Sequence, residues 1–407
     1  MVSLGDLVRI SHGYAFKGEF FAAYGTNAIV TPGNFYEFGG FREVGAKQRF
    51  YTAWYPAIYD LVADDLIVAM TEQAAGLLGS ASFVPKNGHW LHNQRIGRIS
   101  LISDEVTPTY LFYILNSEAF RIEVNRTAAG TKVKHTSPKK LEEIDVLLPP
   151  LAEQKGISEA IDDAHVRIIT LERLIAKKQA IKQGMMQQLL VGRTRLPGFR
   201  SDWIPQQLGS VLDKLQAGVS VNSVPDPGPH SVLKTSSVSG GEFDPLERKT
   251  VAPSDIRRAK VSPRADSLII SRMNTPTLVG EVGYVAADWP TLFLPDRLWL
   301  ATKRRTASVN MRWLGYMLSS ARYRKQLREI ATGTSGSMKN IARTAFLQLP
   351  VPFPPIEEQA AISSALADLD RDLANYHARL VKANNIKQGM MQQLLTGRTR
   401  LPVSEAP

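Results

Sequence analysis

The sequence predicts an α+β protein in which two similar domains are separated by a long antiparallel two-helix coiled coil, with pseudo-two-fold symmetry between the halves. One observation is a repeat: residues 181–197 read IKQGMMQQLLVGRTRLP, and residues 386–402 differ from them only by Thr396 in place of Val191. Another is a heptad-like spacing of apolar residues around each copy. A third is a series of short strand-like runs elsewhere. A repeat of this kind indicates that the chain has two similar halves, before any single helix or strand is assigned.

Composition limits the class of protein and its partners. The net charge of +11 and the pI of about 9.6 favour a polyanionic partner, nucleic acid ahead of a membrane surface, although a merely basic soluble protein is the alternative. The chain has no cysteine, which excludes disulfides and a cysteine nucleophile and fits a cytoplasmic location. The N-terminus lacks the apolar core of a signal peptide. No segment approaches the roughly 18 apolar residues of a membrane span, so no membrane contact is expected.

Residues 1–148 form the first predicted domain. Short apolar or alternating runs between turn residues predict strands at 7–10, 65–70, 80–85, 95–102 and 144–149. Residues 108–126 have helical spacing and predict one helix that begins near a proline. The combination of strands and a helix makes this domain α+β.

Two long helices are predicted, one in residues 149–197 and one in residues 354–407. Their apolar residues follow a seam of alternating three- and four-residue steps, as in a coiled coil. Gly184 and Gly389 lie in mid-helix, where each costs about 1 kcal/mol relative to alanine. We expect close approach of two backbones there, with tolerance on a solvent face as the alternative. The predicted packing positions are Ile157, Ile161, Ala164, Ile168, Leu171, Ile175, Ile181, Met185 and Leu189, and then Ile362, Leu366, Leu369, Leu373, Tyr376, Leu380, Ala383, Ile386, Met390 and Leu394.

Residues 198–353 repeat the plan of the first domain with a different sequence. The run ADSLIISRM at 265–273 resembles ADDLIVAM at 63–70, and residues 312–330 predict the matching single helix. GSMKN at 336–340 stands where the first domain has GTKVKH at 130–135. The scaffold is therefore expected to be shared, whereas the surface loops differ.

Helix length and charge suggest a role in DNA binding. A helix of about 40 residues is about 60 Å long, which corresponds to one to two turns of duplex DNA. Such a spacer could hold two different reading domains over two unlike half-sites with an unread gap, although a scaffold without any DNA role is the alternative. Residues 201–350 carry 20 Lys and Arg against 12 Asp and Glu, whereas residues 1–150 carry 14 against 15. The second domain is therefore the more basic one.

Candidate DNA contacts follow from charge and loop position, and ordinary solvated surfaces are the alternative for each cluster. In the first domain they are Arg95, Lys132, Lys134, His135 and Lys139. In the second domain they are Arg304, Arg305, Ser337, Lys339, Asn340 and Arg343.

Catalytic motifs are missing from the sequence. Both Pro-Pro pairs lack the preceding polar residue and the following aromatic residue of an amino-group methyltransferase, and no glycine-rich nucleotide-binding loop occurs. Asp145, Glu153 and Lys155 imitate a nuclease pattern, but the repeat has Ala360 where Lys155 stands. No histidine spacing suits a metal apart from an isolated pair, so no metal site is expected. We expect a chain that is not an enzyme and holds no cofactor.

Four segments together resemble a known family. PPLAEQ at 149–154, KQGMMQQLLVG at 182–192, PPIEEQ at 354–359 and KQGMMQQLLTG at 387–397 resemble the specificity subunit of a type I restriction–modification system. The resemblance covers the whole chain, and its repeated motifs are fairly specific. A coiled-coil scaffold that holds two protein-binding domains is the alternative.

The resemblance implies a division of labour within a larger complex. Residues 1–148 and 198–353 would be target-recognition domains, each reading one half of a bipartite, asymmetric site in double-stranded DNA. The helices would set the gap and bind two modification (methyltransferase) subunits, which carry S-adenosylmethionine. Restriction subunits would join for translocation and cleavage with ATP and Mg²⁺. The repeated helical stretch is then expected to meet the modification subunits, rather than the DNA.

Overall fold

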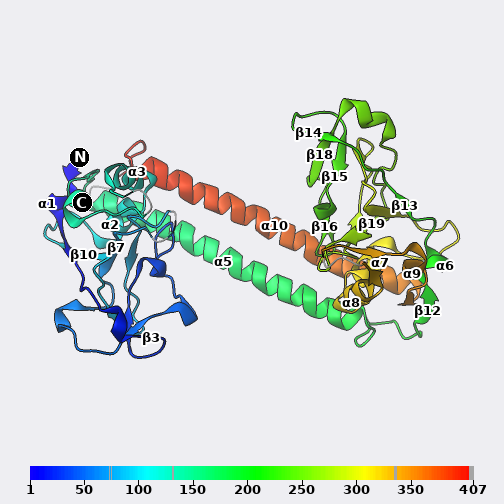
Figure 1. Cartoon of the computed structure of the whole chain (residues 1–407), viewed down its shortest axis with the longest axis horizontal. Coiled ribbons are helices and arrows are strands. Elements are labelled where there is room, and N and C mark those ends of the chain that lie inside the picture. Colours follow the sequence, from blue (N-terminus) through cyan, green and yellow to red (C-terminus); the bar gives the residue numbers. More distant parts are fainter. Residues whose placement is uncertain (73, 75, 131–132, 334–336, 403–407) are drawn as a thin grey trace. The chain divides into compact units, whose positions relative to one another are not determined.

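The structure is a computed structural model that describes residues 1–402 except 73, 75, 131–132 and 334–336. It contains two compact units, one formed by Met1–Glu172 with Ala378–Pro407 and the other by Arg173–His377. The long helices α5 (Leu151–Leu189) and α10 (Ile356–Leu394) each begin in one unit and end in the other (Figure 1). Each unit therefore holds one α+β domain, the start of one long helix and the end of the other.

The first unit is built around β7 (Leu66–Ala69), the third strand in a four-stranded antiparallel sheet of order β2-β10-β7-β8. Every residue of β7 is buried, because Leu66 and Val68 enter one core while Ile67 and Ala69 enter another on the opposite face. A strand covered on both faces needs a continuous apolar run, which is what this stretch of sequence contains. The other strands of this sheet are β2 (Val8–His12), β8 (Ala81–Phe83) and β10 (Ile96–Leu101).

A second sheet in this unit covers one face of the first. It has five short strands in the order β3-β5-β4-β9-β6, of which β4 and β9 are parallel and the other pairs antiparallel. Its strands are β3 (Phe21–Ala22), β4 (Asn27–Ile29), β5 (Phe50–Tyr51), β6 (Asp60–Leu61) and β9 (His89–Leu91). The remaining elements are β1 (Val2–Ser3), β11 (Asp145–Val146), α1 (Leu4–Leu7), α2 (Pro108–Leu115), α3 (Glu118–Thr127) and α4 (Pro138–Glu142). The five predicted strands of this domain are confirmed as β2, β7, β8, β10 and β11.

The second unit has the same plan around β19 (Ser267–Ser271). Its central sheet has the order β13-β23-β19-β21, and its outer sheet has the order β14-β18-β15-β22 with β15 and β22 parallel. The strands are β13 (Gln216–Ala217), β14 (Ser223–Val224), β15 (Ser231–Leu233), β18 (Arg248–Val251), β21 (Val282–Val285), β22 (Leu292–Phe293) and β23 (Leu298–Ala301).

Smaller sheets and helices complete the second unit. The two-stranded sheets pair β12 (Ile204–Gln207) with β26 (Pro350–Phe353) and β16 (Val238–Ser239) with β17 (Glu242–Phe243). A three-stranded sheet contains β20 (Met273–Asn274), β24 (Ala331–Thr332) and β25 (Lys339–Ile341). The helices are α6 (Leu208–Val211), α7 (Met311–Leu318), α8 (Ala321–Glu329) and α9 (Arg343–Leu347).

The single helix predicted at 108–126 is wrong, because the structure has two helices there. The Ser117 hydroxyl accepts a hydrogen bond from Phe120 N and so begins α3 as an N-cap. Asn116 is buried and bonds both backbone groups of Ala81, which ties the end of α2 to the central sheet. The prediction of one helix at 312–330 is wrong in the same way, since α7 and α8 are separated at Ser319 and Ser320.

Most of the predicted packing positions on α5 and α10 are buried or half-buried. In the first unit, Ile157 and Ile161 belong to the domain core together with Leu394. In the second unit, Ile362 and Leu366 share a core with Leu189. The long helices therefore pack against the domains as well as against each other. Ile168, Leu171 and Ile175 are also buried, whereas Met185, Leu373, Tyr376, Leu380 and Met390 are half-buried.

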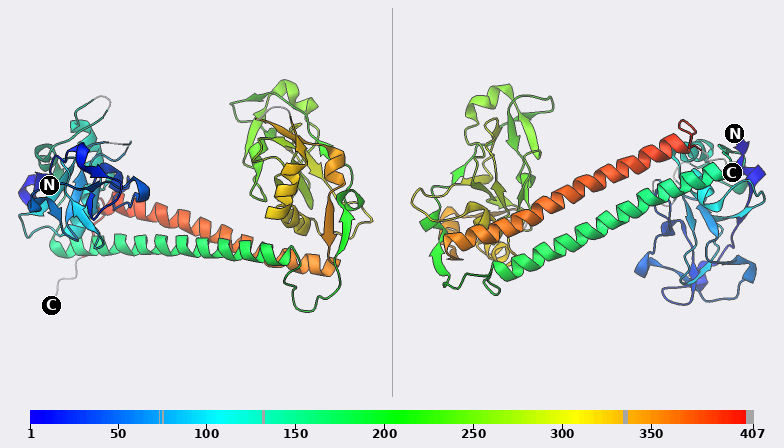
Figure 2. Two further views of the ribbon diagram at one scale, coloured as in Figure 1. Left: turned by 60° about the horizontal axis from the view of Figure 1, so that its bottom comes forward. Right: turned by 180° about the vertical axis from the view of Figure 1, so that it is seen from behind.

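Two predicted seam positions, Ile181 and Ile386, are wrong, because their side chains are 40% and 48% exposed. In the second unit, lysines of α5 turn towards α10 where an apolar seam was expected. Lys178 Nζ lies 2.6 Å from Asp372 Oδ2, and Lys182 Nζ lies 2.5 Å from Asp370 Oδ1. The order of these pairs shows that the two helix segments run antiparallel in this unit, and both views of Figure 2 show them side by side.

The close backbone approach expected at Gly184 and Gly389 is also wrong. A Cβ atom built on either glycine would meet no described atom within 4 Å. The solvent-face alternative therefore holds within the described chain. The helix surface beside each glycine is open among the described residues.

The repeated motifs are joined to each other inside each unit. In the first unit, Arg400 of the GRTRLP sequence donates from Nε and Nη2 to the two carboxylate oxygens of Glu153, at 2.7 and 2.6 Å. In the second unit, Arg195 binds Glu358 in the same bidentate way, both at 2.6 Å. Both carboxylates are buried, and the Arg400 guanidinium holds the pKa of Glu153 below its usual range. We call these two ion pairs the clasps.

The glutamine that follows each clasp glutamate connects the long helix to its domain. Gln154 donates to Pro149 O and Glu105 O, and its own carbonyl accepts a hydrogen bond from Thr107 N. Gln359 donates to Pro354 O and accepts from Asn310 N. The Pro-Pro-x-x-Glu-Gln motif is thus explained by structure, which removes the remaining reason to assign Glu153 to a nuclease site.

Candidate nucleic-acid interface

In the first unit, the end of β7 brings together residues from three distant parts of the sequence. Met70 N donates to Arg95 O at 2.9 Å, and Thr136 N donates to Met70 O at 3.0 Å. Beside them, the Thr71 hydroxyl lies 3.2 Å from His135 Nδ1. The side chains of Arg95, Lys134 and His135 are exposed around this strand end.

The second unit repeats this backbone arrangement at the end of β19. Arg272 N donates to Arg297 O at 3.1 Å, and Ile341 N donates to Arg272 O at 2.9 Å. Strand β25 then places Asn340 opposite Met273 and Lys339 opposite Asn274. Arg297 therefore occupies the position of Arg95, and Lys339–Asn340 occupies that of Lys134–His135. We call these two groups the strand-end clusters.

The structure separates some of the predicted DNA contacts from the strand-end clusters. Arg304 and Arg305 follow the opposite end of β23 from Arg297, and Arg304 Nε is bound to Leu212 O at 2.9 Å. Lys139 lies on α4 with its Nζ 4.0 Å from Glu143, and Arg343 is the first residue of α9. Ser337 is exposed just before β25, whereas Lys132 lies outside the described residues.

Two residues of the second cluster, Arg272 and Arg297, are missing from the sequence-based list. The offset of 202 residues that pairs Leu66 with Leu268 also pairs Arg95 with Arg297 and could have identified it. Arg272 had no such signal, because the first domain has Met70 at that position. Its guanidinium lies 5.6 Å from the ring of Trp299, in a cation–π contact.

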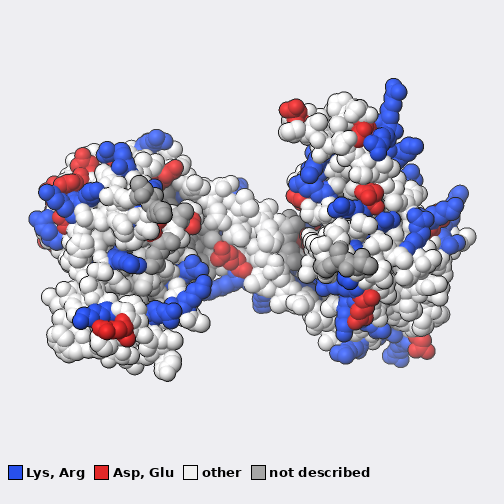
Figure 3. Space-filling view, viewed as in Figure 1, with Lys and Arg blue, Asp and Glu red and all other residues white. Residues whose placement is uncertain are grey.

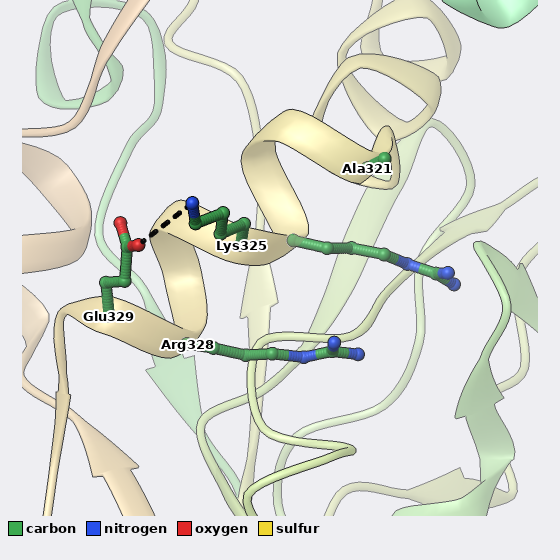
Figure 4. A pocket seen from close by; sticks show the side chains of 5 residues that line it. Ala321, Lys325, Arg328 and Glu329 are labelled. Atoms are coloured by element: carbon green, nitrogen blue, oxygen red, sulfur yellow. Dashed lines mark ion pairs between the residues drawn. The ribbon is translucent and has the colours of Figure 1, made fainter.

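A hollow of about 400 Å³ beside α8 is also rich in positive charge, as Figure 4 shows. Its cations already have carboxylate partners. Arg324 and Arg328 lie 2.7 and 3.4 Å from the buried carboxylate of Glu281, and Lys325 pairs with Glu329 at 3.8 Å. This hollow is therefore a weaker candidate for binding an anion than the strand-end clusters, whose cations have no carboxylate partner among the described residues.

Metal and membrane sites have no support within the described residues. They contain no group of three or more His, Asp or Glu side chains suited to hold a metal ion. No helix among them is long and apolar enough to cross a membrane. Two α+β domains, each with a basic cluster at the end of its central strand, are typical of a DNA-binding protein.

Comparison with known proteins shows which family this chain resembles. Residues 1–183 match the model of the type I restriction modification DNA specificity domain. The type I restriction enzyme MjaVIII specificity subunit of Methanocaldococcus jannaschii is 25% identical over 310 residues, which cover 72% of this chain and 70% of that protein. The EcoKI specificity subunit of Escherichia coli is 24% identical over 357 residues, covering 82% and 74%.

Solved structures show the same fold. The S subunit of a type I restriction–modification system from M. genitalium has a TM-score of 0.60 at 14% identity, covering 97% of this chain and 95% of that one. A chain from a study of complex assembly and conformational transition of the type I restriction–modification system has a TM-score of 0.56 at 17% identity, covering 97% and 96%. The family model and the curated relatives make this chain similar to the DNA specificity subunits of type I restriction–modification systems.

Proposed function

We propose that this chain reads a bipartite, asymmetric DNA site, with one half-site for each domain. The observation that carries this proposal is the pair of strand-end clusters. The same backbone hydrogen bonds present Thr71, Lys134 and His135 in one unit, and Met273, Lys339 and Asn340 in the other. A shared frame with different side chains suits recognition of two unlike sequences, because base edges differ in their donor and acceptor patterns.

Replacement of residues 1–145 by the first domain of another family member tests this proposal. Methylated sites would be mapped across the genome in cells that carry the exchanged chain with its modification subunits. We expect one half-site to change completely, while the other half-site and the gap stay the same. A change in both half-sites, or in neither, would contradict the assignment of one half-site to each domain.

We further propose that α5 and α10 form one antiparallel coiled coil with pseudo-two-fold symmetry, which sets the gap between the half-sites. The clasps support this proposal, because in each unit an arginine from one repeat copy binds a glutamate in the first turn of the other long helix. The Lys178–Asp372 and Lys182–Asp370 pairs support it as well.

Two modification subunits are proposed to dock on the two copies of the repeat. Each copy has the same residues on its outer side: Ile181 and Gln187 in one copy and Ile386 and Gln392 in the other are exposed, and Gly184 and Gly389 between them are half-buried. Identical surfaces in a chain whose domains have diverged suit two copies of one partner. The buried positions Ile157, Ile161, Ile168, Leu171 and Ile175 are then internal packing residues rather than docking residues. S-adenosylmethionine, and ATP with Mg²⁺ for restriction subunits, would be held by those partners.

The substitution Ile181→Glu tests the docking surface. Because Ile181 is 40% exposed, we expect the free energy of unfolding to change by only about 0.5 kcal/mol. We expect native mass spectrometry to show one bound modification subunit where the unaltered chain binds two. Val166→Glu is the matched control, since Val166 is an exposed apolar residue of α5 outside the repeat. Retention of two subunits by the Ile181 variant would refute this docking site.

A further inference from the structure

A second hollow in the second unit, of about 460 Å³, lies between the outer sheet and the turn before β23. Its polar lining differs from that of the hollow beside α8. Hydroxyl groups of Ser220, Ser223 and Thr235 line it together with the cations Lys249 and Arg297. Figure 3 shows that lysine and arginine side chains also gather on the viewed face of this unit over the outer sheet. The hollow therefore offers both hydroxyl donors and positive charge.

Lys249 and Arg297 have no side-chain partner among the residues that the structure describes. Within the described chain, the side chains of Lys249 and Arg297 make no ion pair or hydrogen bond, and both are exposed. A third lining cation, Lys234, is paired with Glu247 at 3.4 Å, and Ser236 donates to the same carboxylate at 2.6 Å. Asp296 is the carboxylate in the lining. Lys249 and Arg297 are thus the charges available to an incoming anion.

One residue that lines this hollow has an aromatic counterpart in the first unit. The segment after β2 and the segment after β13 both pass close over a neighbouring strand end, where Gly13 and Gly218 avoid a clash with backbone oxygens. Three residues further on, Phe16 packs on the ring of Tyr51, with 4.7 Å between ring centroids. The second unit has the smaller Val221 three residues after its glycine, and Val221 lines the hollow. The two domains therefore differ here, with the large Phe16 in the first and the smaller Val221 in the second.

We propose that this hollow binds a backbone phosphate of the DNA in the second half-site, an inference that rests on the proposed function. Phosphate oxygens accept charge-assisted hydrogen bonds from lysine and arginine and further bonds from hydroxyl groups. The hollow adjoins the second strand-end cluster, because Arg297 lines the hollow and its backbone oxygen accepts a hydrogen bond from Arg272 N. A phosphate bound there fixes the register in which Lys339 and Asn340 meet the base edges.

The consequence is an unequal division of the electrostatic binding energy. Residues 201–350 carry a net charge of +8, whereas residues 1–150 carry −1. Binding of phosphates by cations releases counterions, so that affinity falls with salt in proportion to the number of contacts. Salt dependence should therefore arise mainly in the second half-site.

Lys249→Gln and Arg297→Gln test the proposal in the complete complex with its modification subunits. Affinity for a duplex with the native site would be measured across a salt series. For each variant we expect about tenfold weaker binding at low salt, equal for specific and scrambled duplexes. For the double variant we expect the slope of log K against log salt to become shallower by about 1. Lys325→Gln is the control of equal charge change, because Lys325 pairs with Glu329 outside the hollow.

Three outcomes would overturn the phosphate assignment. One is a slope for the hollow variants equal to that of the Lys325 control. Another is an altered base preference for Arg297→Gln, which would make it a base contact. A third is stabilisation of the free chain by inorganic phosphate without any effect of the variants on DNA binding, which would assign the hollow to a free anion. If instead the unaltered complex did not discriminate between native and scrambled duplexes, the proposed function itself would fail.

Discussion

Substitution of Arg195 by alanine is expected to lower the free energy of unfolding by about 3 kcal/mol, because it leaves the buried carboxylate of Glu358 without its cation. Glu358 is 0% exposed, and its remaining side-chain contact is a 3.3 Å hydrogen bond from Trp203 Nε1. The Arg195 side chain is 25% exposed, so the expected loss is at the lower end of the range for buried pairs. Urea denaturation followed by tryptophan fluorescence would measure it.

Two variants make this prediction specific. Arg400→Ala should cost less than Arg195→Ala, since the Arg400 side chain is 60% exposed and water can replace part of its contact with Glu153. Removal of both charges in the second clasp, by Arg195→Met with Glu358→Met, should recover much of the lost stability. A loss below about 1 kcal/mol for Arg195→Ala would show that the clasp behaves as an ordinary surface ion pair.

Insertion of seven residues into both long helices is expected to abolish methylation at the original site and to create a site with a gap about three base pairs wider. The insertions would follow Glu172 and His377, the equivalent positions at which the two compact units meet along each helix. Seven residues preserve the heptad phase and add about 10 Å, and stacked base pairs rise about 3.4 Å each. Methylome sequencing would report the new gap and both half-sites together.

An insertion into α5 alone is the control for this experiment. It would shift Lys178 away from Asp372 and Arg195 away from Glu358, so we expect a poorly folded chain rather than a new gap. An unchanged gap after both insertions would show that the helices do not measure the distance between the half-sites. If the half-sites stay the same while the gap widens, the helices set the gap and the domains read the half-sites.

Much of the fold could be predicted from the sequence, because its strongest signals are local or repeated. The run at 66–70 is apolar throughout because β7 is covered on both faces. A continuous apolar run can be recognised without knowledge of the partner strands. The helix breaks at Ser117 and Ser320 were not predicted. Serine is tolerated within a helix and also begins one, and its role depends on what the preceding helix end contacts.

The candidate interface could be predicted only in part. Lys134, His135, Lys339 and Asn340 were identified from charge in a loop, and the structure adds Arg272 and Arg297 beside them. Arg304 and Arg305 were also predicted as DNA contacts from their charge, yet β23 places them at the opposite end of the sheet from Arg297. Charge is visible in a sequence, but the end of the sheet to which a loop belongs depends on strand order.

The sequence by itself determined the two-part plan, the strands around β7 and β19, the long helices and the family. These depend on periodicity and on a repeat, which are properties of the chain order. The tertiary structure alone decided that each repeat arginine binds a glutamate in the first turn of the other long helix, that Gly184 and Gly389 face open space, and that Lys249 and Arg297 line one hollow. Those features join residues that are far apart in the chain, and only the packing of the folded units brings their side chains together.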